Sequence, residues 1–311
     1  MEQKENNLSL IQKFRTGKMK AEWLLLFVAF IWGSSFPLTK ISLNYISPVL
    51  LVFLRFAITT ILFYIVYRKQ VSIVRFSEWK NGAILGFLLF VGFVTQTIGI
   101  KFTSASNSAF ITGTNLIMIP FVQYFLTKVK PKKENFIGII IVIAGLYILS
   151  DAYNSSMNYG DFITLLCALS FAVHIVFLDK YLKKDKIINL IFGQFLSMSV
   201  FCLIFLIAFE ILIDKSFYFI PTVPVISILL YVSIIGTLFV FIIVTKYQGR
   251  TTPVKAGIIY NMEQVFAVIF AFLILNERLK WMQIAGGCLM ITGLFISELT
   301  GFLRSKQKIT P

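Results

Sequence analysis

Residues 48–67 read PVLLVFLRFAITTILFYIVY, an apolar run of 20 residues in which Arg55 is the single charged side chain. A helix needs about 20 consecutive apolar residues to cross the hydrocarbon core of a bilayer. Further runs of this kind lie before and after it. The ten predicted spans are 22–43, 48–67, 80–100, 105–127, 135–150, 161–179, 187–209, 223–245, 254–275 and 281–299, of which the fifth is short. The sequence therefore predicts an all-α integral membrane protein with ten transmembrane helices.

The composition of the whole chain supports this fold class. Hydrophobic residues make up 58% of the 311 residues and charged residues only 14%, with a mean hydropathy of +0.84. Soluble domains are about 25% charged, and disordered chains contain few apolar residues. A soluble enzyme and a disordered chain are both excluded. The three cysteines lie inside apolar runs without the spacing of a metal site, and we expect no metal and no cofactor.

The positive charges predict the orientation of the spans. The chain carries 29 Lys and Arg against 14 Asp and Glu, a net charge of +15. With the N-terminus in the cytoplasm, 23 basic residues fall in cytoplasmic segments and 5 in external ones, as the positive-inside rule requires. A nucleic-acid-binding protein would gather its basic residues on one folded face, so we expect no nucleic-acid partner. We expect a multi-pass protein of the cytoplasmic membrane with both termini in the cytoplasm.

Weak internal similarity divides the spans into two halves. A Leu-x-Phe-x-x-Phe pattern at residues 51–56 recurs at an offset of 139, and the glycine pair Gly138 and Gly145 recurs at an offset of 148. Because each half contains five spans, the two repeats must be inverted in the membrane, which places a substrate site near the midplane between them. The predicted units are a cytoplasmic tail 1–21, a first repeat 22–150, a second repeat 151–299 and a cytoplasmic tail 300–311.

Two ionisable residues at mid-membrane depth are leading candidates for function, because polar side chains in hydrocarbon normally face a cavity or a partner. Glu263 in span nine is the single acidic residue at that depth and is a candidate proton carrier. His174 in span six is the only histidine and suits proton coupling or a substrate hydrogen bond. A packing role is the alternative for both. The repeat offsets place His174 on Ser35 and Glu263 on Asn115, so all four equivalent positions are polar.

Arg55 is the third ionisable candidate. Its guanidinium keeps its charge and can hold a substrate carboxylate in a bidentate pair. The alternative is an ion pair within the bundle, with Glu263 as the partner. Aromatic and neutral polar residues complete the predicted cavity. They are Trp32, Ser35, Gln96, Asn115, Asn261 and Gln264.

Prolines and glycines predict local helix geometry. We expect Pro37 and Pro120 to interrupt spans one and four, since each removes a helical hydrogen bond and can expose a carbonyl to a cavity. Gly82 and Gly86 form a GxxxG pattern, which we expect to allow close packing of helices within the chain rather than dimerisation.

Short motifs in both halves resemble the drug/metabolite transporter superfamily of the EamA type. They are Trp32-Gly33-Ser34-Ser35-Phe36, Leu54-Arg55-Phe56, Thr103-Ser104-Ala105-Ser106-Asn107-Ser108-Ala109-Phe110, Pro120, Phe171-Ala172-Val173-His174-Ile175, Glu263-Gln264-Val265-Phe266-Ala267 and Asn276-Glu277-Arg278-Leu279. The family often has Glu-Pro where this chain has Glu263-Gln264, and Val129 stands where an acidic residue would match Glu277. The resemblance implies ten helices in two inverted repeats, alternating access, and export of small metabolites, amino acids or drugs, often without ATP.

The sequence is therefore interpreted as a secondary transporter that exports a small metabolite, with a small-molecule substrate, the lipid bilayer and protons as its partners. Glu263 and His174 are the candidates for coupling or substrate contact, and Arg55 for binding a carboxylate. No GxxxxGK[ST] loop occurs, so we do not expect ATP-driven transport by this chain alone. An uncoupled facilitator, a membrane-embedded enzyme and an accessory subunit are the alternatives. One histidine and no GxGD or HExxH motif argue against the enzyme.

Overall fold

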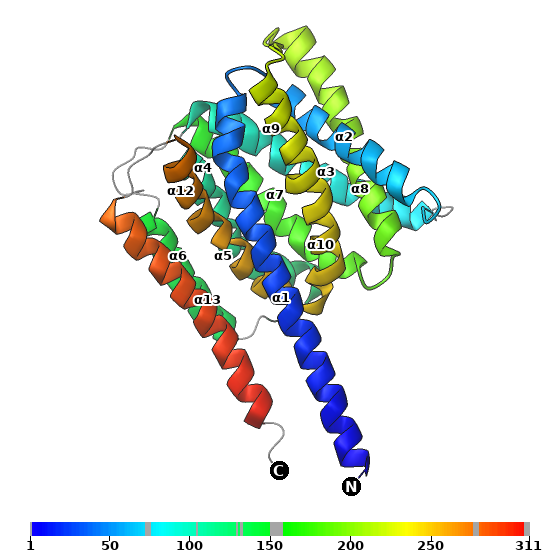
Figure 1. Ribbon diagram of the computed structural model, residues 1–311, viewed down its shortest axis with the longest axis vertical. Helices are drawn as coiled ribbons and strands as arrows, with labels where there is room; N and C mark the ends of the chain where they lie inside the picture. The colour runs from blue at the N-terminus through cyan, green and yellow to red at the C-terminus, as the bar shows by residue number, and fades with distance from the viewer. Residues whose placement is uncertain are drawn as a thin grey trace.

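The computed structural model describes residues 2–71, 76–103, 105–128, 130, 133–149, 158–275 and 280–307. In these ranges the chain forms a bundle of helices without β-strands (Figure 1). One isolated antiparallel bridge joins Ile46 to Phe219, between two loops at the same end of the bundle. The all-α fold class predicted from the sequence is confirmed.

The helices follow the predicted order of spans. In the first half they are α1 (Glu2–Ser42), α2 (Pro48–Tyr67), α3 (Phe76–Phe102), α4 (Ala105–Gly113), α5 (Asn115–Thr127) and α6 (Lys133–Leu149). In the second half they are α7 (Tyr159–Tyr181), α8 (Ile187–Phe205) with the π-helix η2 (Leu206–Ile213), α9 (Val223–Ser233), the π-helix η3 (Ile234–Phe239), α10 (Val240–Tyr247), the 3-10 helix η4 (Gln248–Arg250), α11 (Pro253–Tyr260), α12 (Met262–Leu275) and α13 (Trp281–Gln307).

Eight helical spans of the described chain are long and apolar enough to cross a bilayer. Two shorter apolar stretches, Phe136–Ile148 in α6 and Ile284–Gly293 in α13, occupy the places of the predicted fifth and tenth spans. Outside these spans, α1 begins at Glu2 and α13 continues to Gln307. The segments interpreted as tails are thus largely helical extensions, and both project from the same end of the bundle (Figure 1).

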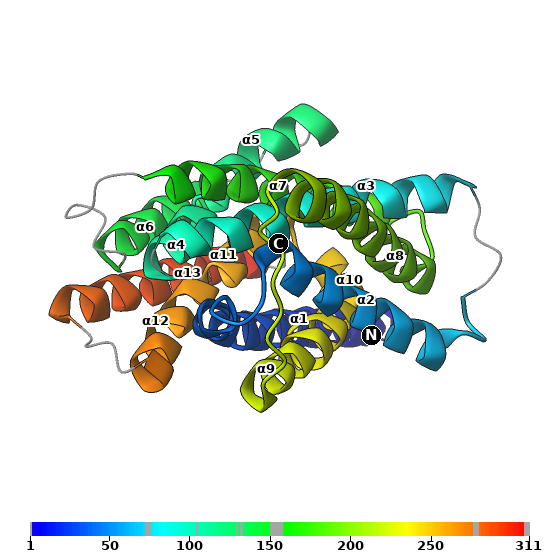
Figure 2. The ribbon, with the colours of Figure 1, turned by 90° about the horizontal axis from the view of Figure 1, so that it is seen from above.

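The helix packing follows a two-fold exchange of the halves, in which α1, α2 and α6 correspond to α7, α8 and α13. Under this exchange α3 corresponds to α9–α10, and α4–α5 corresponds to α11–α12. The α1–α12 contact then corresponds to the contact of α7 with α4–α5. In the same way, the α3–α7 contact corresponds to the α1–α10 contact. The α2–α8 and α6–α13 pairs map onto themselves. Figure 2 shows the α6–α13 pair at one edge of the bundle and α2, α3 and α8 at the other.

The glycines that revealed the repeat lie where α6 crosses α13. A Cβ atom added at Gly145 would lie 2.7 Å from the carbonyl oxygen of Gly286. One added at Gly293 would lie 3.1 Å from the carbonyl oxygen of Gly138. The exchange converts one contact into the other, because the offset of 148 links Gly138 to Gly286 and Gly145 to Gly293. The glycines therefore recur in both halves because each half supplies one side of the same crossing.

The GxxxG pattern of α3 has the packing role expected for it. A Cβ atom at Gly82 would lie 2.8 Å from the Cα atom of Gly193 on α8, and one at Gly86 would lie 2.6 Å from the carbonyl oxygen of Gln194. The backbones of α3 and α8 therefore meet directly inside the chain. Small residues permit such close approach between membrane helices.

Large apolar side chains cover much of the outer surface of the bundle, as a bilayer requires. Phe121 and Phe125 of α5 are 61% and 72% exposed, and Trp281 at the start of α13 is 84% exposed. Such exposure would be unfavourable in water. In lipid it places apolar groups against acyl chains, which supports a multi-pass membrane protein.

Candidate functional site

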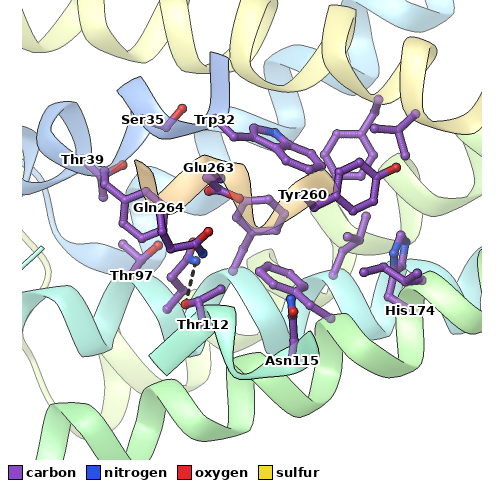
Figure 3. Close-up of a pocket in the computed structure, with 18 of the residues that line it drawn as sticks. Trp32, Ser35, Thr39, Thr97, Thr112, Asn115, His174, Tyr260, Glu263 and Gln264 are labelled. Atoms are coloured by element: carbon purple, nitrogen blue, oxygen red, sulfur yellow. Dashed lines mark hydrogen bonds between the residues drawn. The ribbon is translucent and has the colours of Figure 1, made fainter. Parts of the chain in front are cut away.

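A cavity of about 80 Å³ lies between the two halves, with room for several water molecules or one small solute. The structure brings all the site residues predicted from the sequence into its lining. They are Trp32, Ser35, Arg55, Gln96, Asn115, His174, Asn261, Glu263 and Gln264. Figure 3 labels six of them, Trp32, Ser35, Asn115, His174, Glu263 and Gln264, which come from several helices, with Glu263 between Ser35 and His174. Their grouping is a structural fact, whereas their contact with a substrate stays a prediction.

Two broken helices form part of the cavity wall. The break between α4 and α5 lies at Thr114, with φ −63° and ψ −11°, and that between α11 and α12 lies at Asn261, with φ −64° and ψ −11°. The expected interruptions at Pro37 and Pro120 were wrong, because both prolines lie inside continuous helices. The offset of 148 matches Thr114 to Met262, so the two breaks lie within one residue of each other in the repeat. Discontinuous helices in the two halves of an inverted repeat are typical of the substrate sites of transporters.

Polar side chains at the two breaks stabilise them in similar ways. The Thr114 hydroxyl donates to the carbonyl of Ile111 at 2.6 Å, and the Asn261 amide donates to the carbonyl of Gly257 at 3.0 Å. Each bond uses a carbonyl from the turn just before the break. In both halves, therefore, the helix break is associated with a polar residue and not with a proline.

Glu263 lies two residues after the second break, in the first turn of α12. Among the residues that the structure describes, its carboxylate has no hydrogen-bond or ion-pair partner, and it faces the cavity (Figure 3). Gly33 of α1 packs against its backbone, since a Cβ atom at Gly33 would lie 2.9 Å from the carbonyl oxygen of Glu263. The lack of a side chain at Gly33 thus allows the backbones of α1 and α12 to approach closely beside Glu263.

Arg55 of α2 is held by span eight rather than by a carboxylate. Its Nε donates to the Thr237 hydroxyl at 2.5 Å, and its Nη2 donates to the carbonyl of Gly236 at 3.1 Å. The guanidinium carbon lies 4.8 Å from the centroid of the Phe93 ring, in cation–π geometry. Within the described chain no salt bridge joins Arg55 to Glu263, although both line the same cavity and their charges lie close enough to interact. Its remaining amine, Nη1, has no bond to a described residue and is available to a ligand.

The π-helix η3 holds two cavity residues, Trp32 and Arg55, and the sequence did not reveal it. Its wide turn includes Gly236, whose carbonyl accepts hydrogen bonds from both Trp32 Nε1, at 3.1 Å, and Arg55. Short π-helical turns inside α-helices occur frequently at functional sites. The carbonyl belongs to an apolar stretch and carries no side-chain signal. The pair Gly236-Thr237 within that stretch is the only hint that the sequence offers.

Amide side chains line the cavity between the charged groups. The Gln96 amide donates to the Thr112 hydroxyl at 3.2 Å, a bond dashed in Figure 3. The Asn261 amide donates to Asn115 Oδ1 at 3.1 Å, and so joins the two broken helices. Three buried oxygens have no partner among the described residues and are free to bond a ligand: Ser35 Oγ, Asn261 Oδ1 and Gln264 Oε1.

His174 occupies the far end of the cavity, on α7. Its Nε2 lies 3.4 Å from Gln194 Oε1, at the position of α8 that the repeat matches to Arg55. In the first half, Ser35 and Arg55 both line the cavity. In the second half, His174 lines it and Gln194 lies behind His174. The contact with Gln194 fits the packing alternative for His174 as well as a functional one.

Aromatic rings form much of the remaining wall, and sequence reasoning identified only Trp32 among them. The Trp32 ring makes edge contacts with Phe241 and Tyr260, with centroids 5.8 Å and 5.5 Å apart. Phe93 packs in the same way against Phe171, at 5.3 Å. The sequence contains 33 phenylalanines, so composition alone did not distinguish the cavity phenylalanines from those facing lipid.

A model of the EamA-like transporter family matches residues 19–151 and again residues 158–299. The chain belongs to the EamA-like transporter family. Similar relatives include an uncharacterized transporter of Archaeoglobus fulgidus, 29% identical over 91% of this chain and 87% of its own length. Another is a Salmonella typhimurium protein named "probable amino-acid metabolite efflux pump", 24% identical over 94% of this chain and 99% of its own length.

A crystal structure of another protein has the same fold. It superposes with a TM-score of 0.74 at 16% identity and covers 91% of this chain and 98% of its own. The family, the relatives and the apolar helices together identify a multi-pass membrane transporter of the EamA type. The motif Asn276–Leu279, which supported the resemblance in the sequence, lies outside the described residues.

Proposed function

We propose that this EamA-type transporter is a secondary transporter that exports a small zwitterionic metabolite, an amino acid or a related compound, by alternating access at the cavity. The proposed location is the cytoplasmic membrane, with both termini in the cytoplasm. The chain uses no ATP and no cofactor in this scheme. Protons supply the driving force through Glu263.

The observation that carries this proposal is the placement of two opposite charges in one cavity. Arg55 retains a free amine, the Glu263 carboxylate has no hydrogen bond to a described residue, and no salt bridge joins the two charges across the cavity. Charges buried in a membrane normally find partners. An amino acid would supply a partner for each charge, because its carboxylate can bind the Arg55 guanidinium and its ammonium can bind the Glu263 carboxylate.

The neutral lining fits the rest of such a substrate. Trp32, Phe93 and Phe241 provide apolar surface for a side chain, and the free oxygens of Ser35 and Gln264 can accept hydrogen bonds from the ammonium group. The name of the Salmonella relative points to the same chemical class.

Glu263 couples substrate and proton by competition. A carboxylate binds either the substrate ammonium or a proton, but not both at full strength. When the cavity opens to the more acidic side, protonation of Glu263 releases the substrate. The proton then leaves on the opposite side, and export is driven by the proton gradient.

The test uses purified protein in proteoliposomes, with labelled amino acids and an imposed pH gradient. The wild type should accumulate substrate in response to the gradient. Glu263→Gln should lose the response to the gradient and should exchange substrate only at raised substrate concentration, because the amide keeps a hydrogen-bond acceptor for the ammonium but not the charge. Asp214→Asn, in an exposed loop, is the matched control and should behave as the wild type. Flux of the wild type that ignores the gradient would instead identify an uncoupled facilitator.

A further inference from the structure

Different helices line the two ends of the cavity. Thr39 and Thr97 lie at one end in Figure 3, and His174 and Tyr260 at the other. Ile100, on α3, also lines the cavity, as do Ile175 and Gln248 on the second half. Ile100, Ile175 and Gln248 each take part in a hydrogen bond between helices at one end of the cavity.

At the first end, Lys40 ties α1 to α3. Its Nζ donates to the carbonyl of Ile100 at 2.6 Å and to the carbonyl of Thr103 at 2.9 Å. These carbonyls belong to the last turn of α3 and the residue that follows it, where a cation is favoured by the helix dipole. Thr39, the residue before Lys40, and Ile100, the acceptor of its bond, both line the cavity, so the contact lies next to the cavity wall.

At the second end, Gln248 of η4, which directly follows α10, ties this part of the chain to α7. Its Nε2 donates to the carbonyl of Ile175 at 2.9 Å, and its Oε1 accepts from the Tyr260 hydroxyl at 3.0 Å. Gln248 is only 1% exposed, and all its polar atoms are used in these two bonds apart from one amide hydrogen. The three residues line the cavity, so this bond also forms part of its boundary.

The two contacts join corresponding spans of the two halves, although the offset of 139 matches Lys40 to Asp179 and Ile175 to Phe36. The offset of 148 places Ile100 on Gln248, and α1 and α3 correspond to α7 and the α9–α10 span. Each contact therefore joins the first and third spans of one half, at opposite ends of the cavity. Away from these contacts, α1 packs chiefly on α12 and α10, whereas α3 packs chiefly on α7 and α8.

We infer that Lys40 and Gln248 are the two gate residues of this protein, one at each end of the cavity. Lys40 closes the end opposite the chain termini, and Gln248 closes the end near them. The gates differ chemically, because one is a charge-assisted contact of a lysine and the other is a neutral amide network. Their use in moving a substrate rests on the proposed function, whereas their control of access to the cavity does not.

Opening each gate is feasible because water can replace the lost bonds. Lys40 and the end of α3 lie near one end of the bundle, where an ammonium and free carbonyls can be hydrated. The neutral amide of Gln248 has the weaker bonds to lose. A hydrogen bond to a charged group contributes more than one between neutral groups, so loss of Lys40 should open its gate more than loss of Gln248 opens the other.

The experiment measures access to the cavity from each side of the membrane. The reporter is Ser35→Cys in a chain whose native cysteines, Cys167, Cys202 and Cys288, are replaced by alanine. A charged, membrane-impermeant methanethiosulfonate is added to vesicles of either orientation. The labelling rate is followed with no substrate present, so that transport plays no part in the readout.

Lys40→Met should raise the labelling rate from the side opposite the termini by about tenfold, the effect of losing a charge-assisted hydrogen bond. Gln248→Leu should raise it from the side of the termini by about fivefold, as for a neutral hydrogen bond. Lys40→Arg keeps the donors and should label at the parent rate. Lys101→Met and Gln70→Leu, at exposed positions, are the matched controls and should also leave both rates unchanged.

The inference is overturned if Lys40→Met leaves access unchanged, or if both variants open the same side. Elution of each variant at the parent volume in gel filtration establishes that it is folded before labelling. Failure of the gates is distinguishable from failure of the proposed function. Unchanged labelling with intact amino-acid transport refutes the gates alone, and side-specific labelling without any such transport refutes the zwitterion proposal alone.

Discussion

The two halves of the cavity share a backbone plan and differ in chemistry. Their helices break within one residue of each other in the repeat, at Thr114 and Asn261, with nearly identical dihedral angles. Yet the residue that follows the first break is the neutral Asn115, and its counterpart in the second half is Glu263. On the neighbouring helices the difference is reversed, because the first half carries Arg55 where the second carries Gln194. The inverted repeats thus give the two halves a similar backbone. One residue difference at each of two equivalent positions gives the site one positive and one negative charge.

The largest expected effect comes from making α2 resemble α8. Arg55→Gln places in the first half the residue that the second half has at the equivalent position. It removes the guanidinium that we assign to the substrate carboxylate, and loss of one partner of a buried charged pair costs about 2–5 kcal/mol. Transport in proteoliposomes should fall at least about 30-fold, since each 1.4 kcal/mol is a factor of ten.

Arg250→Gln is the control for this variant, because Arg250 lies in an exposed turn and its recorded contact is with the ring of Tyr247. It should transport at the parent rate. Equal transport by Arg55→Gln and the parent would show that the guanidinium has only a packing role in α2.

A second way to probe the comparison is to exchange small residues. Gly33 corresponds to Ala172 at the offset of 139, but a Cβ atom at Gly33 would lie 2.5 Å from Phe266 Cβ and 2.9 Å from the backbone of Ala267. Gly33→Ala should therefore destabilise the protein by about 1–3 kcal/mol through overpacking. Its apparent melting temperature in detergent should fall accordingly.

The reciprocal change, Ala172→Gly, creates no clash and should cost only about 0.5–1 kcal/mol through helix propensity. A smaller loss of thermal stability for Gly33→Ala than for Ala172→Gly would show that the approach of α1 to α12 is not close. The comparison between the two variants thus measures how differently the halves are packed at equivalent positions.

The smallest effect is expected at the end of the cavity. His174→Ser gives the second half the residue of the first, and it removes one neutral hydrogen bond to Gln194, worth about 0.5–1.5 kcal/mol. The apparent substrate affinity should fall by about three- to tenfold, and the response to the proton gradient should be retained. Loss of that response in His174→Ser, but not in Glu263→Gln, would transfer the coupling role to His174.

Much of this architecture was predictable because its signals are local. Ten apolar runs and the placement of basic residues depend only on run length and charge, and the structure has helices at all ten. Arg55, His174 and Glu263 were identifiable because an ionisable side chain in hydrocarbon needs a cavity or a partner. Their common location in one cavity followed from the repeat.

The features that escaped prediction depend on backbone groups and on tertiary contacts. The Gly236 carbonyl binds Trp32 and Arg55 only because η3 has a π-helical turn, and carbonyl groups have no sequence signature. The breaks lie at Thr114 and Asn261 rather than at proline, because neighbouring helices and polar side chains satisfy the freed groups. The role of Lys40 required the position of the end of α3, which its own sequence does not specify.

The central claim is that Arg55 and Glu263 bind the two charges of one zwitterion. Its most direct test is the thermal stability of the purified protein with leucine or phenylalanine, their methyl esters and their N-acetyl derivatives. A ligand that binds only the folded state raises the melting temperature. The account predicts a rise with at least one free amino acid, and little or none with its ester or N-acetyl form. An equal rise with the blocked and free compounds would contradict it.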